Sequence, residues 1–257
     1  MIKLKTQQEI EIIAEGGKIL ARILKEISQK VKPGVGTSEL NKLAEQLIFE
    51  NKAKPSFKGY QVNPNEEPFP TALCTSINQE IVHAPAEPNR LLQSGDIIGL
   101  DLGLEYKSLY TDTAVTVPVG KINQQSKHLL KITRESLEQG IRQFKEGNTL
   151  ADVGQAIEDY AKKAGYSVVR ELIGHGVGHS VHEEPKVPNY YTEEGKTIKI
   201  ERGLVVAIEP MVNIGQWQIK LHSNGFTFVT KDNSLSAQFE HTVALDHFGK
   251  TRILTQA

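Results

Sequence analysis

The sequence predicts an α+β fold of two related halves, each with a pair of helices packed on a curved antiparallel sheet. A helix, a glycine-containing turn and a second helix occur twice, and the turns Lys32-Pro-Gly34 and Lys145-Glu-Gly147 lie 113 residues apart (145 − 32). Strand-like segments follow each helix pair. We therefore expect a single domain, 1–257, with an internal duplication of approximately 1–120 and 121–257, although chance recurrence of a common helix–glycine–helix pattern is the alternative.

Composition excludes several classes of protein. The chain has 257 residues, 30 basic and 31 acidic side chains and a net charge of −1, so bulk charge does not direct it to nucleic acid or to an anionic membrane. The single cysteine, Cys74, excludes an internal disulfide and a thiolate-rich zinc site, and fits a reducing compartment. The N-terminus lacks the apolar region of a signal peptide, and the apolar runs are too short to span a bilayer. We expect a cytoplasmic protein.

Two helices are predicted at the start of the chain. Thr6 and Glu9 have the spacing of a capping box, and apolar residues then recur at steps of three and four up to about residue 30. Thr37 and Ser38 can cap a second helix that ends near Asn51.

The strands of the first half carry two aspartates. A long loop, 54–70, is rich in Pro, Asn and Glu, and short strands are expected at 72–77 and 80–83. Two further strands, 97–103 and 109–117, contain Asp101 and Asp112, and 105–108 is expected to connect them as a hairpin, so that the two carboxylates can face each other. A buried lone carboxylate is costly unless it is paired, hydrogen-bonded or bound to a metal.

The second half repeats this plan. Helices are expected over 124–145 and from Thr149, and the apolar strand 204–208 runs into Glu209. Segments 219–223 and 226–230 flank Asn224-Gly225, a strong hairpin signal. A last strand, 236–245, places Gln238 and Glu240 on one face and Phe239 and His241 on the other.

A histidine-rich segment, Glu171–Pro185, separates the second helix pair from these strands. It contains His175, His179 and His182, interleaved with glycines that allow the backbone to approach a ligand closely. Because neutral imidazoles are common metal ligands and acid–base groups, this segment predicts a functional loop, with a solvated loop as the alternative.

The acidic residues of the four strands predict a metal centre. Four carboxylates could not cluster in a core without counter-charge, because they would repel one another and take up protons. Two divalent cations would balance them. With one imidazole added, two aspartates and two glutamates suit Mn, Fe, Co or Zn better than Mg or Ca. The four residues are Asp101, Asp112, Glu209 and Glu240.

Three motifs resemble the type I methionine aminopeptidases of the pita-bread metallopeptidase superfamily. They are Gly174-His175-Gly-Val-Gly-His-Ser-Val-His182-Glu-Glu-Pro, Ile208-Glu209-Pro-Met-Val and Ala237-Gln-Phe-Glu240-His-Thr-Val. The resemblance covers nearly the whole chain and implies the pita-bread fold. It also implies a dinuclear metal site in which Asp112 and Glu240 bridge two ions, Asp101 binds one, and His175 and Glu209 bind the other.

The resemblance implies catalytic roles for His83, His182 and Glu209. His182 would stabilise the oxyanion, Glu209 would shuttle protons, and His83 would contact the scissile amide. The implied substrate is the N-terminal Met of nascent polypeptides when the second residue is small. The ribosome is a candidate partner, and we expect a monomer with no nucleic-acid specificity and no membrane attachment.

The expected pocket for the methionine side chain departs from the usual pattern of the resembled enzymes. Asp101-Leu-Gly stands where Asp-Val-Thr is common and is closer to Xaa-Pro peptidases of the same fold, and an insertion at 61–68 alters one loop. A Xaa-Pro peptidase and a non-catalytic binding protein that kept the fold therefore remain as alternatives. The residues expected to bind substrate are His83, His182, Phe57, Tyr60, Phe69, Cys74, Val181 and Phe226.

Overall fold

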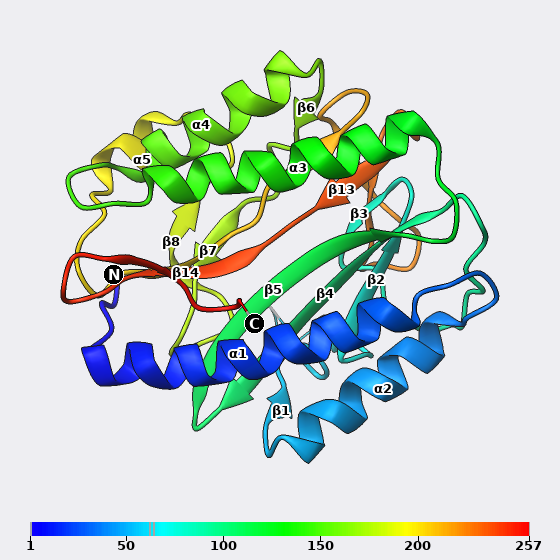
Figure 1. Cartoon of the computed structure of the whole chain (residues 1–257), viewed down its shortest axis with the longest axis horizontal. Helices are drawn as coiled ribbons and strands as arrows, with labels where there is room; N and C mark the ends of the chain where they lie inside the picture. The colour runs from blue at the N-terminus through cyan, green and yellow to red at the C-terminus, as the bar shows by residue number, and fades with distance from the viewer. Residues whose placement is uncertain (1, 62, 64, 257) are drawn as a thin grey trace.

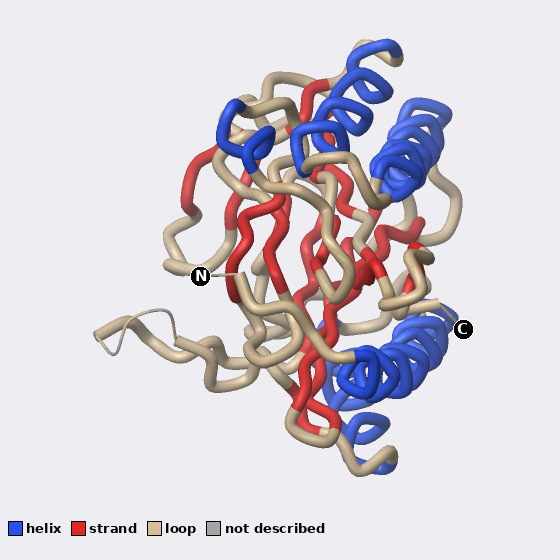
Figure 2. The backbone as a smooth tube through the Cα atoms, turned by 90° about the vertical axis from the view of Figure 1, so that its left-hand side faces the viewer, coloured by secondary structure: helices blue, strands red, loops and turns tan. Residues whose placement is uncertain are grey.

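Two pairs of helices cover the outside of a layer of antiparallel strands (Figure 1). The computed structural model describes residues 2–61, 63 and 65–256. Figure 2 shows most of the helices on one side of the strands. The predicted α+β arrangement, with one helix pair in each half, is confirmed. The helices are α1 (Gln7–Lys30), α2 (Thr37–Glu50), α3 (Gln124–Gln143), α4 (Leu150–Lys163) and the short α5 (Glu193–Thr197).

The first helix begins where its capping box predicts. The Thr6 hydroxyl accepts a hydrogen bond from the Glu9 amide at 3.2 Å, and the Glu9 carboxylate accepts one from the Thr6 amide at 2.8 Å. The predicted cap of α2 is wrong. Gly36 is the N-cap, because Glu39 reaches back to its amide at 3.1 Å and Thr37 is already helical. The Thr37 hydroxyl instead donates to the Ala86 carbonyl at 2.6 Å.

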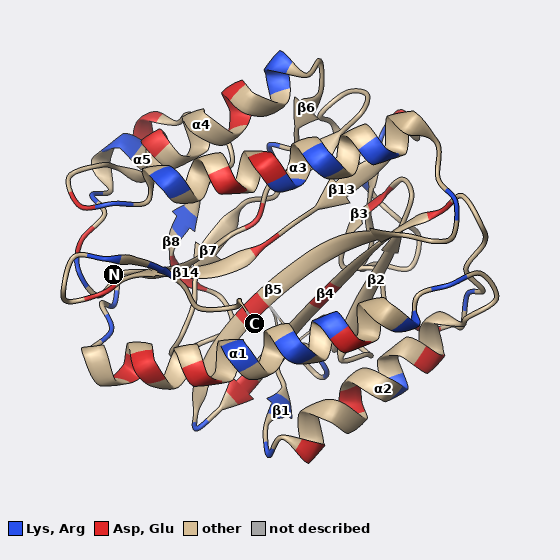
Figure 3. Ribbon diagram, in the orientation of Figure 1, with Lys and Arg blue, Asp and Glu red and all other residues tan. Residues whose placement is uncertain are grey.

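The second helix pair also has side-chain caps. Asn123 accepts a hydrogen bond from the Ser126 amide at 2.8 Å at the start of α3, and Asp152 accepts one from the Thr149 amide at 2.7 Å at the start of α4. Local side-chain caps therefore mark the starts of α3 and α4. Each of the four long helices carries both charge signs (Figure 3).

The first-half sheet brings the two aspartates to one face. Its longest strands pair Asp101 with Ala114 and Gly103 with Asp112, so the two carboxylates are diagonal neighbours and not directly opposite. The hairpin turn is shorter than expected and consists of Lys107 and Ser108, with φ of 51° and 64°. The strands of this sheet are β1 (Lys54–Pro55), β2 (Leu73–Ile77), β4 (Ile97–Tyr106) and β5 (Leu109–Pro118).

The remaining strands form three antiparallel groups, ordered β15-β14-β9-β7-β8, β13-β10-β6 and β11-β12-β3. Their bounds are β3 (Glu80–Val82), β6 (Ser167–Val168), β7 (Gly174–Gly176), β8 (Glu183–Val187), β9 (Val205–Ile208), β10 (Met211–Asn213), β11 (Ile219–Leu221), β12 (Phe228–Thr230), β13 (Ser236–Gln238), β14 (His241–Leu245) and β15 (Thr251–Ile253).

Three expectations for the second half need correction. The histidine segment is not simply a loop, because β7 and β8 are sheet strands and His175 pairs with Ala207 of β9. The predicted strand 236–245 is interrupted at Phe239 and Glu240. The Asn224-Gly225 hairpin has a longer loop than two residues, because the Asn224 side chain accepts hydrogen bonds from the amides of Phe226 and Thr227 and holds a wider turn.

Threonine side chains join the two halves along β5. Thr242 Oγ1 donates to the Asp112 carbonyl at 2.7 Å and accepts from the Asp112 amide at 3.0 Å. Thr113 Oγ1 donates to the Glu240 carbonyl at 2.7 Å, and Thr116 Oγ1 donates to the Gln238 carbonyl at 2.7 Å. The Glu240 amide also donates directly to the Ala114 carbonyl at 2.9 Å. Each half therefore fixes the backbone of an acidic residue of the other half at the seam.

Each half has its own hydrophobic core beneath its helices. The first includes Leu20, Ile27 and Leu100, and the second includes Leu129, Val153, Val206 and other buried residues of the second half. None of the described helices combines the length and apolarity that crossing a membrane requires.

Candidate metal centre

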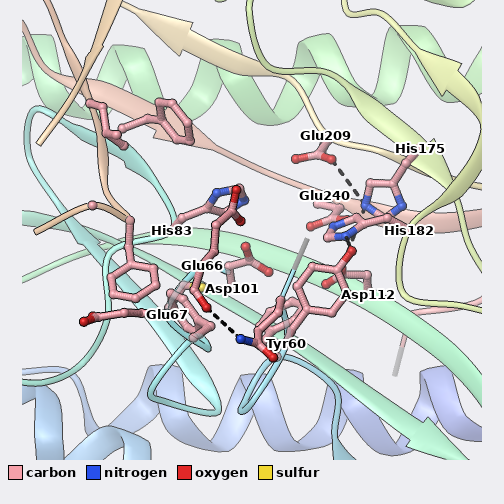
Figure 4. A pocket seen from close by; sticks show the side chains of 18 residues that line it. Tyr60, Glu66, Glu67, His83, Asp101, Asp112, His175, His182, Glu209 and Glu240 are labelled. Atoms are coloured by element: carbon pink, nitrogen blue, oxygen red, sulfur yellow. Dashed lines mark hydrogen bonds and ion pairs between the residues drawn. The ribbon is translucent and has the colours of Figure 1, made fainter. Parts of the chain in front are cut away.

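A pocket of about 390 Å³ lies at the seam between the halves and contains every predicted ligand and catalytic histidine (Figure 4). The acidic residues reach it from different strands. Asp101 belongs to β4 and Asp112 to β5, whereas Glu209 directly follows β9 and Glu240 lies in the break between β13 and β14. All four side chains are buried, with residue exposures between 2% and 9%. The fold therefore brings together the carboxylates that the sequence singled out.

Three side chains form the centre of this pocket. Ligand atoms of Asp112, His175 and Glu240 all lie within 4.8 Å of one another. Glu209 is adjacent, with its Oε1 3.6 Å from His175 Nε2. Asp101 lines the same pocket next to Asp112.

The donor set fits divalent metal ions. Asp101 Oδ1, Asp112 Oδ1 and Glu240 Oε1 are buried without a hydrogen-bond partner among the described residues. Orphaned buried carboxylate oxygens are costly unless a cation or a donor satisfies them. Oxygen ligands combined with one imidazole nitrogen suit a first-row transition metal.

The pKa values of the pocket residues also indicate a site for cations. Burial, followed by repulsion from neighbouring carboxylates, raises the pKa values of Asp101, Glu209 and Glu240 well above their usual range. Burial raises the pKa of Asp112 to about 7. Burial also lowers the pKa of His175 to about 3, with nearby His182 a smaller cause, so this imidazole is neutral and its nitrogen lone pair is free to bind a cation.

Two further histidines border the pocket on opposite sides. His182 lies beside His175, with ring centroids 4.4 Å apart, and its Nδ1 is 2.9 Å from the Tyr60 hydroxyl. Although His182 is accessible from the pocket mouth, surrounding protein atoms lower its pKa to about 4. His83 lies across the pocket (Figure 4), and burial lowers its pKa to about 4. Its φ of 58° is a conformation that few non-glycine residues adopt and that the surrounding structure must enforce.

The residues predicted for the methionine pocket also come together. Phe57, Cys74 and Val181 form a small buried cluster against which Tyr60 and Phe69 pack. Phe226 contacts Phe69 edge to face, with ring centroids 5.6 Å apart. Cys74 is a buried wall whose thiol pKa is raised well above its usual value by burial and then by the nearby carboxylates, so it is unsuited to act as a nucleophile.

Some residues that line the pocket were not predicted from the sequence. Phe228 packs edge to face on His83 at 5.8 Å, because β12 pairs with β3 just before His83. Alternation of Phe226 with Phe228 along one segment is the signal that could have indicated it. Glu66 and Glu67 belong to the 61–68 insertion, whose residues 62 and 64 lie outside the described structure, and no periodic pattern marks them as lining residues.

Comparison with known proteins identifies the family. Residues 11–247 match metallopeptidase family M24. The chain belongs to this family. Its M24 membership, together with the Asp112, His175 and Glu240 group, indicates that the protein uses divalent metal ions.

Several methionine aminopeptidases match nearly the whole chain. It is 42% identical over 245 residues to a methionine aminopeptidase of Clostridium acetobutylicum, with 95% of each chain covered. It is 41% identical to methionine aminopeptidase 1 of Bacillus subtilis, with 97% of each covered. The crystal structure of a Thermotoga maritima methionine aminopeptidase superposes with a TM-score of 0.94 at 37% identity, covering all of both chains.

A more distant solved structure shows a likeness of fold. The prolidase of Pyrococcus horikoshii superposes with a TM-score of 0.77 at 21% identity, and the match covers 99% of this chain but 63% of the prolidase. The pita-bread fold is therefore common to both groups, and the prolidase has additional chain that this M24 protein does not match.

Proposed function

We propose that this protein is a methionine aminopeptidase that removes the N-terminal methionine of nascent polypeptides when the second residue is small. The observation that carries this proposal is the reciprocal full-length match to methionine aminopeptidases, with 95% of both chains covered at 42% identity. The prolidase match leaves more than a third of that chain uncovered. A non-catalytic binding protein is disfavoured because all five candidate ligands are present in one pocket.

We propose that the protein holds two divalent ions of Co, Mn, Fe or Zn. Asp112 and Glu240 would bridge them, Asp101 would bind one, and His175 and Glu209 would bind the other. The orphaned oxygens of three of these carboxylates support this assignment. When bound, the ions supply Lewis-acid activation of a carbonyl and a water of lowered pKa.

The side chains of the protein would hold the substrate and move the protons. Glu209 accepts a hydrogen bond from Gln238 at 3.0 Å, which orients its carboxylate to take a proton from the attacking water and return it to the departing amine. When the Tyr60 hydroxyl donates to Nδ1 of His182, the Nε2 of this neutral ring carries the proton and can donate it to the developing oxyanion.

His83, also neutral, would contact the scissile amide from the opposite side. The methionine side chain would occupy the apolar wall formed by Phe57, Cys74 and Val181, which Tyr60, Phe69 and Phe226 extend. We further propose that the enzyme acts as a cytoplasmic monomer, with the ribosome as a candidate partner because nascent N-termini emerge there.

The decisive experiment compares two peptides. Purified protein with Mn, Fe or Co is expected to release Met from Met-Ala-Ser and to leave a Xaa-Pro peptide uncleaved. Glu240→Ala is expected to lose both turnover and stoichiometric metal, whereas Glu138→Ala, at an exposed position on α3, keeps both. Cleavage of only the Xaa-Pro peptide would refute the proposed activity, and retention of two metals by Glu240→Ala would refute the ligand assignment.

A further inference from the structure

Lys5 is a buried lysine just before α1. Its side chain is 1% exposed and forms an ion pair with Glu183, which is 12% exposed. Its ammonium also donates to the Lys3 carbonyl at 2.8 Å. Lysine is rarely buried to this extent without a partner, because removing the ammonium from water is costly. Because this ion pair is buried, a role in keeping the surface soluble does not explain it.

The backbone of Lys5 is fixed to the second half of the molecule. Its amide donates to the Gly203 carbonyl at 2.7 Å, and its carbonyl is 2.8 Å from His247 Nε2. Gly203 precedes β9 and His247 follows β14, so both anchors border the sheet that carries His175. The N-terminal segment enters α1 beside this sheet (Figure 1). Lys5 therefore presents its ammonium from a rigid position.

The partner of Lys5 belongs to the turn that carries His182. Residues 177–182 connect β7 to β8, and Glu183 is the first residue of β8, directly after His182. Lys5 passes close to this turn, because a Cβ at Gly178, where φ is 137°, would lie 2.6 Å from the Lys5 Cε. On the same turn, His179 Nε2 is 2.7 Å from Glu9 Oε1 of α1. Lys5, before α1, and Glu9, in the first turn of α1, therefore both hold the turn.

We propose that Lys5 is a positioning residue that fixes His182 in the pocket through its ion pair with Glu183. This inference rests on the proposed function, in which His182 must lie at a defined position to donate to the oxyanion. Tyr60 restrains the His182 ring, and Lys5 restrains the backbone through the neighbouring residue, Glu183. Small displacements of such a donor are costly, since a misplacement of ~1 Å can reduce the rate about a hundredfold.

The test replaces the ion pair with an apolar pair, Lys5→Met/Glu183→Met. This change removes both charges together, so neither is left buried and unpaired, and apolar replacement of a buried pair is compatible with folding. The matched control is Lys107→Met/Glu15→Met, which removes an exposed Lys–Glu pair that also joins α1 to a distant turn. Each variant is measured for kcat and KM on Met-Ala-Ser, thermal unfolding, and hydrogen exchange of peptides spanning 176–184.

We expect kcat of the Lys5/Glu183 variant to fall about tenfold to a hundredfold with KM within about twofold, and exchange over 176–184 to accelerate. The control should match the wild type in each measurement. Wild-type kcat and unchanged exchange in a folded Lys5/Glu183 variant would overturn the proposal. If the double variant does not fold, Glu183→Gln replaces it, and unchanged kcat and exchange there would overturn the proposal equally.

The exchange measurement separates this inference from the proposed activity. Failure of the wild type to release Met would refute the activity, while faster exchange over 176–184 in the variant would still support the positioning contact. Normal turnover by the wild type and by the variant would refute the positioning role and leave the activity intact.

Discussion

A single residue, Gly103, accounts for one departure from the usual sequence of methionine aminopeptidases. A Cβ at this position would lie 2.3 Å from Ser56 Oγ and 2.8 Å from Phe57 Cε1. Gly103 therefore makes room for the Phe57 ring, which forms part of the apolar wall of the pocket. Local packing therefore explains the glycine of Asp101-Leu-Gly103. This glycine is not evidence for the specificity of a Xaa-Pro peptidase.

We expect Gly103→Ala to displace the Phe57 ring and raise KM for Met-Ala-Ser several-fold. Overpacking of this kind costs about 1–3 kcal/mol of folding stability. A several-fold rise in KM corresponds to roughly 1 kcal/mol of lost binding, because each ~1.4 kcal/mol is a tenfold change. Gly99→Ala is the matched control on the same strand, because its Cβ would have no neighbour closer than 3.5 Å. Steady-state kinetics of both variants test this explanation. Equal KM values in Gly103→Ala and Gly99→Ala would show that Phe57 does not shape the methionine site.

At the scale of elements, Thr242 connects β14 to β5 at the position of Asp112. Its hydroxyl both donates to the Asp112 carbonyl and accepts from the Asp112 amide. Thr242→Val keeps the shape of the side chain but leaves these buried backbone groups unsatisfied. We expect the variant to lose about 1–3 kcal/mol of unfolding free energy in the metal-free state.

Urea unfolding of chelated protein measures this loss. Thr197→Val is a suitable comparison, because its hydroxyl donates only to the Glu194 carbonyl in an exposed position on α5. The comparison variant should change stability by less than about 0.5 kcal/mol. Similar losses of unfolding free energy in both variants would show that the Thr242 contact at the seam contributes no more than an exposed hydroxyl contact.

The contact between α1 and the histidine turn predicts a dependence on pH. The hydrogen bond from His179, followed by that from the Thr6 amide, lowers the pKa of Glu9 from 4.5 to about 2. Because the folded state lowers this pKa, the stabilisation is fully present above about pH 4.5 and is lost as pH falls towards 2. Glu9→Gln should therefore destabilise the protein most above pH 4.5, and the difference from wild type should shrink at pH 3.

Urea unfolding of both proteins at pH 6 and pH 3 checks the sign of this dependence. Glu26→Gln, at an exposed position of the same helix, serves as control. A difference between Glu9→Gln and wild type that grows on acidification would contradict the assigned direction.

Local signals in the sequence explain which elements could be predicted. The capping pair Thr6 and Glu9 fixed the start of α1, because it satisfies backbone groups within four residues. The cap of α2 was missed because Thr37 bonds to a distant segment, at Ala86, which no local pattern shows. The strand containing His175 was missed because its glycines have low strand propensity, and pairing with β9 provides the stability instead.

The candidate site was also predictable from the sequence only in part. Asp101 and Asp112 were recognisable because acidic residues interrupt otherwise apolar strands, a pattern that is costly without a cation. Their diagonal placement was not predictable, since it depends on the two-residue turn at Lys107 and Ser108. Likewise, the contact between Lys5 and Glu183 joins residues 178 positions apart, and only the folded chain shows it.

At the scale of the whole molecule, the metal centre lies where the two cores meet. Asp101 and Asp112 come from the first half, and His175, Glu209 and Glu240 come from the second. Each half has its own helices and its own core. The seam is held by buried hydrophobic clusters with residues from both halves, by the threonine contacts, and by neutralisation of the carboxylates. The similar plan of the halves agrees with an internal duplication, which stays a prediction.

Metal binding should therefore stabilise the whole molecule. A ligand that binds only the folded state at a concentration of about 100 Kd adds roughly 2.7 kcal/mol, which for a chain of this size raises Tm by roughly 5–10 °C. We expect this rise when Mn or Co is added to chelated protein, measured by calorimetry, because the ions would neutralise carboxylates contributed by both halves. Glu240→Ala should show a much smaller rise, since it removes a proposed bridging ligand at the seam. An equal rise in Tm in wild type and Glu240→Ala would show that the stabilising metal binds elsewhere. Metal binding at the carboxylate cluster would then not be what stabilises the contact between the two halves.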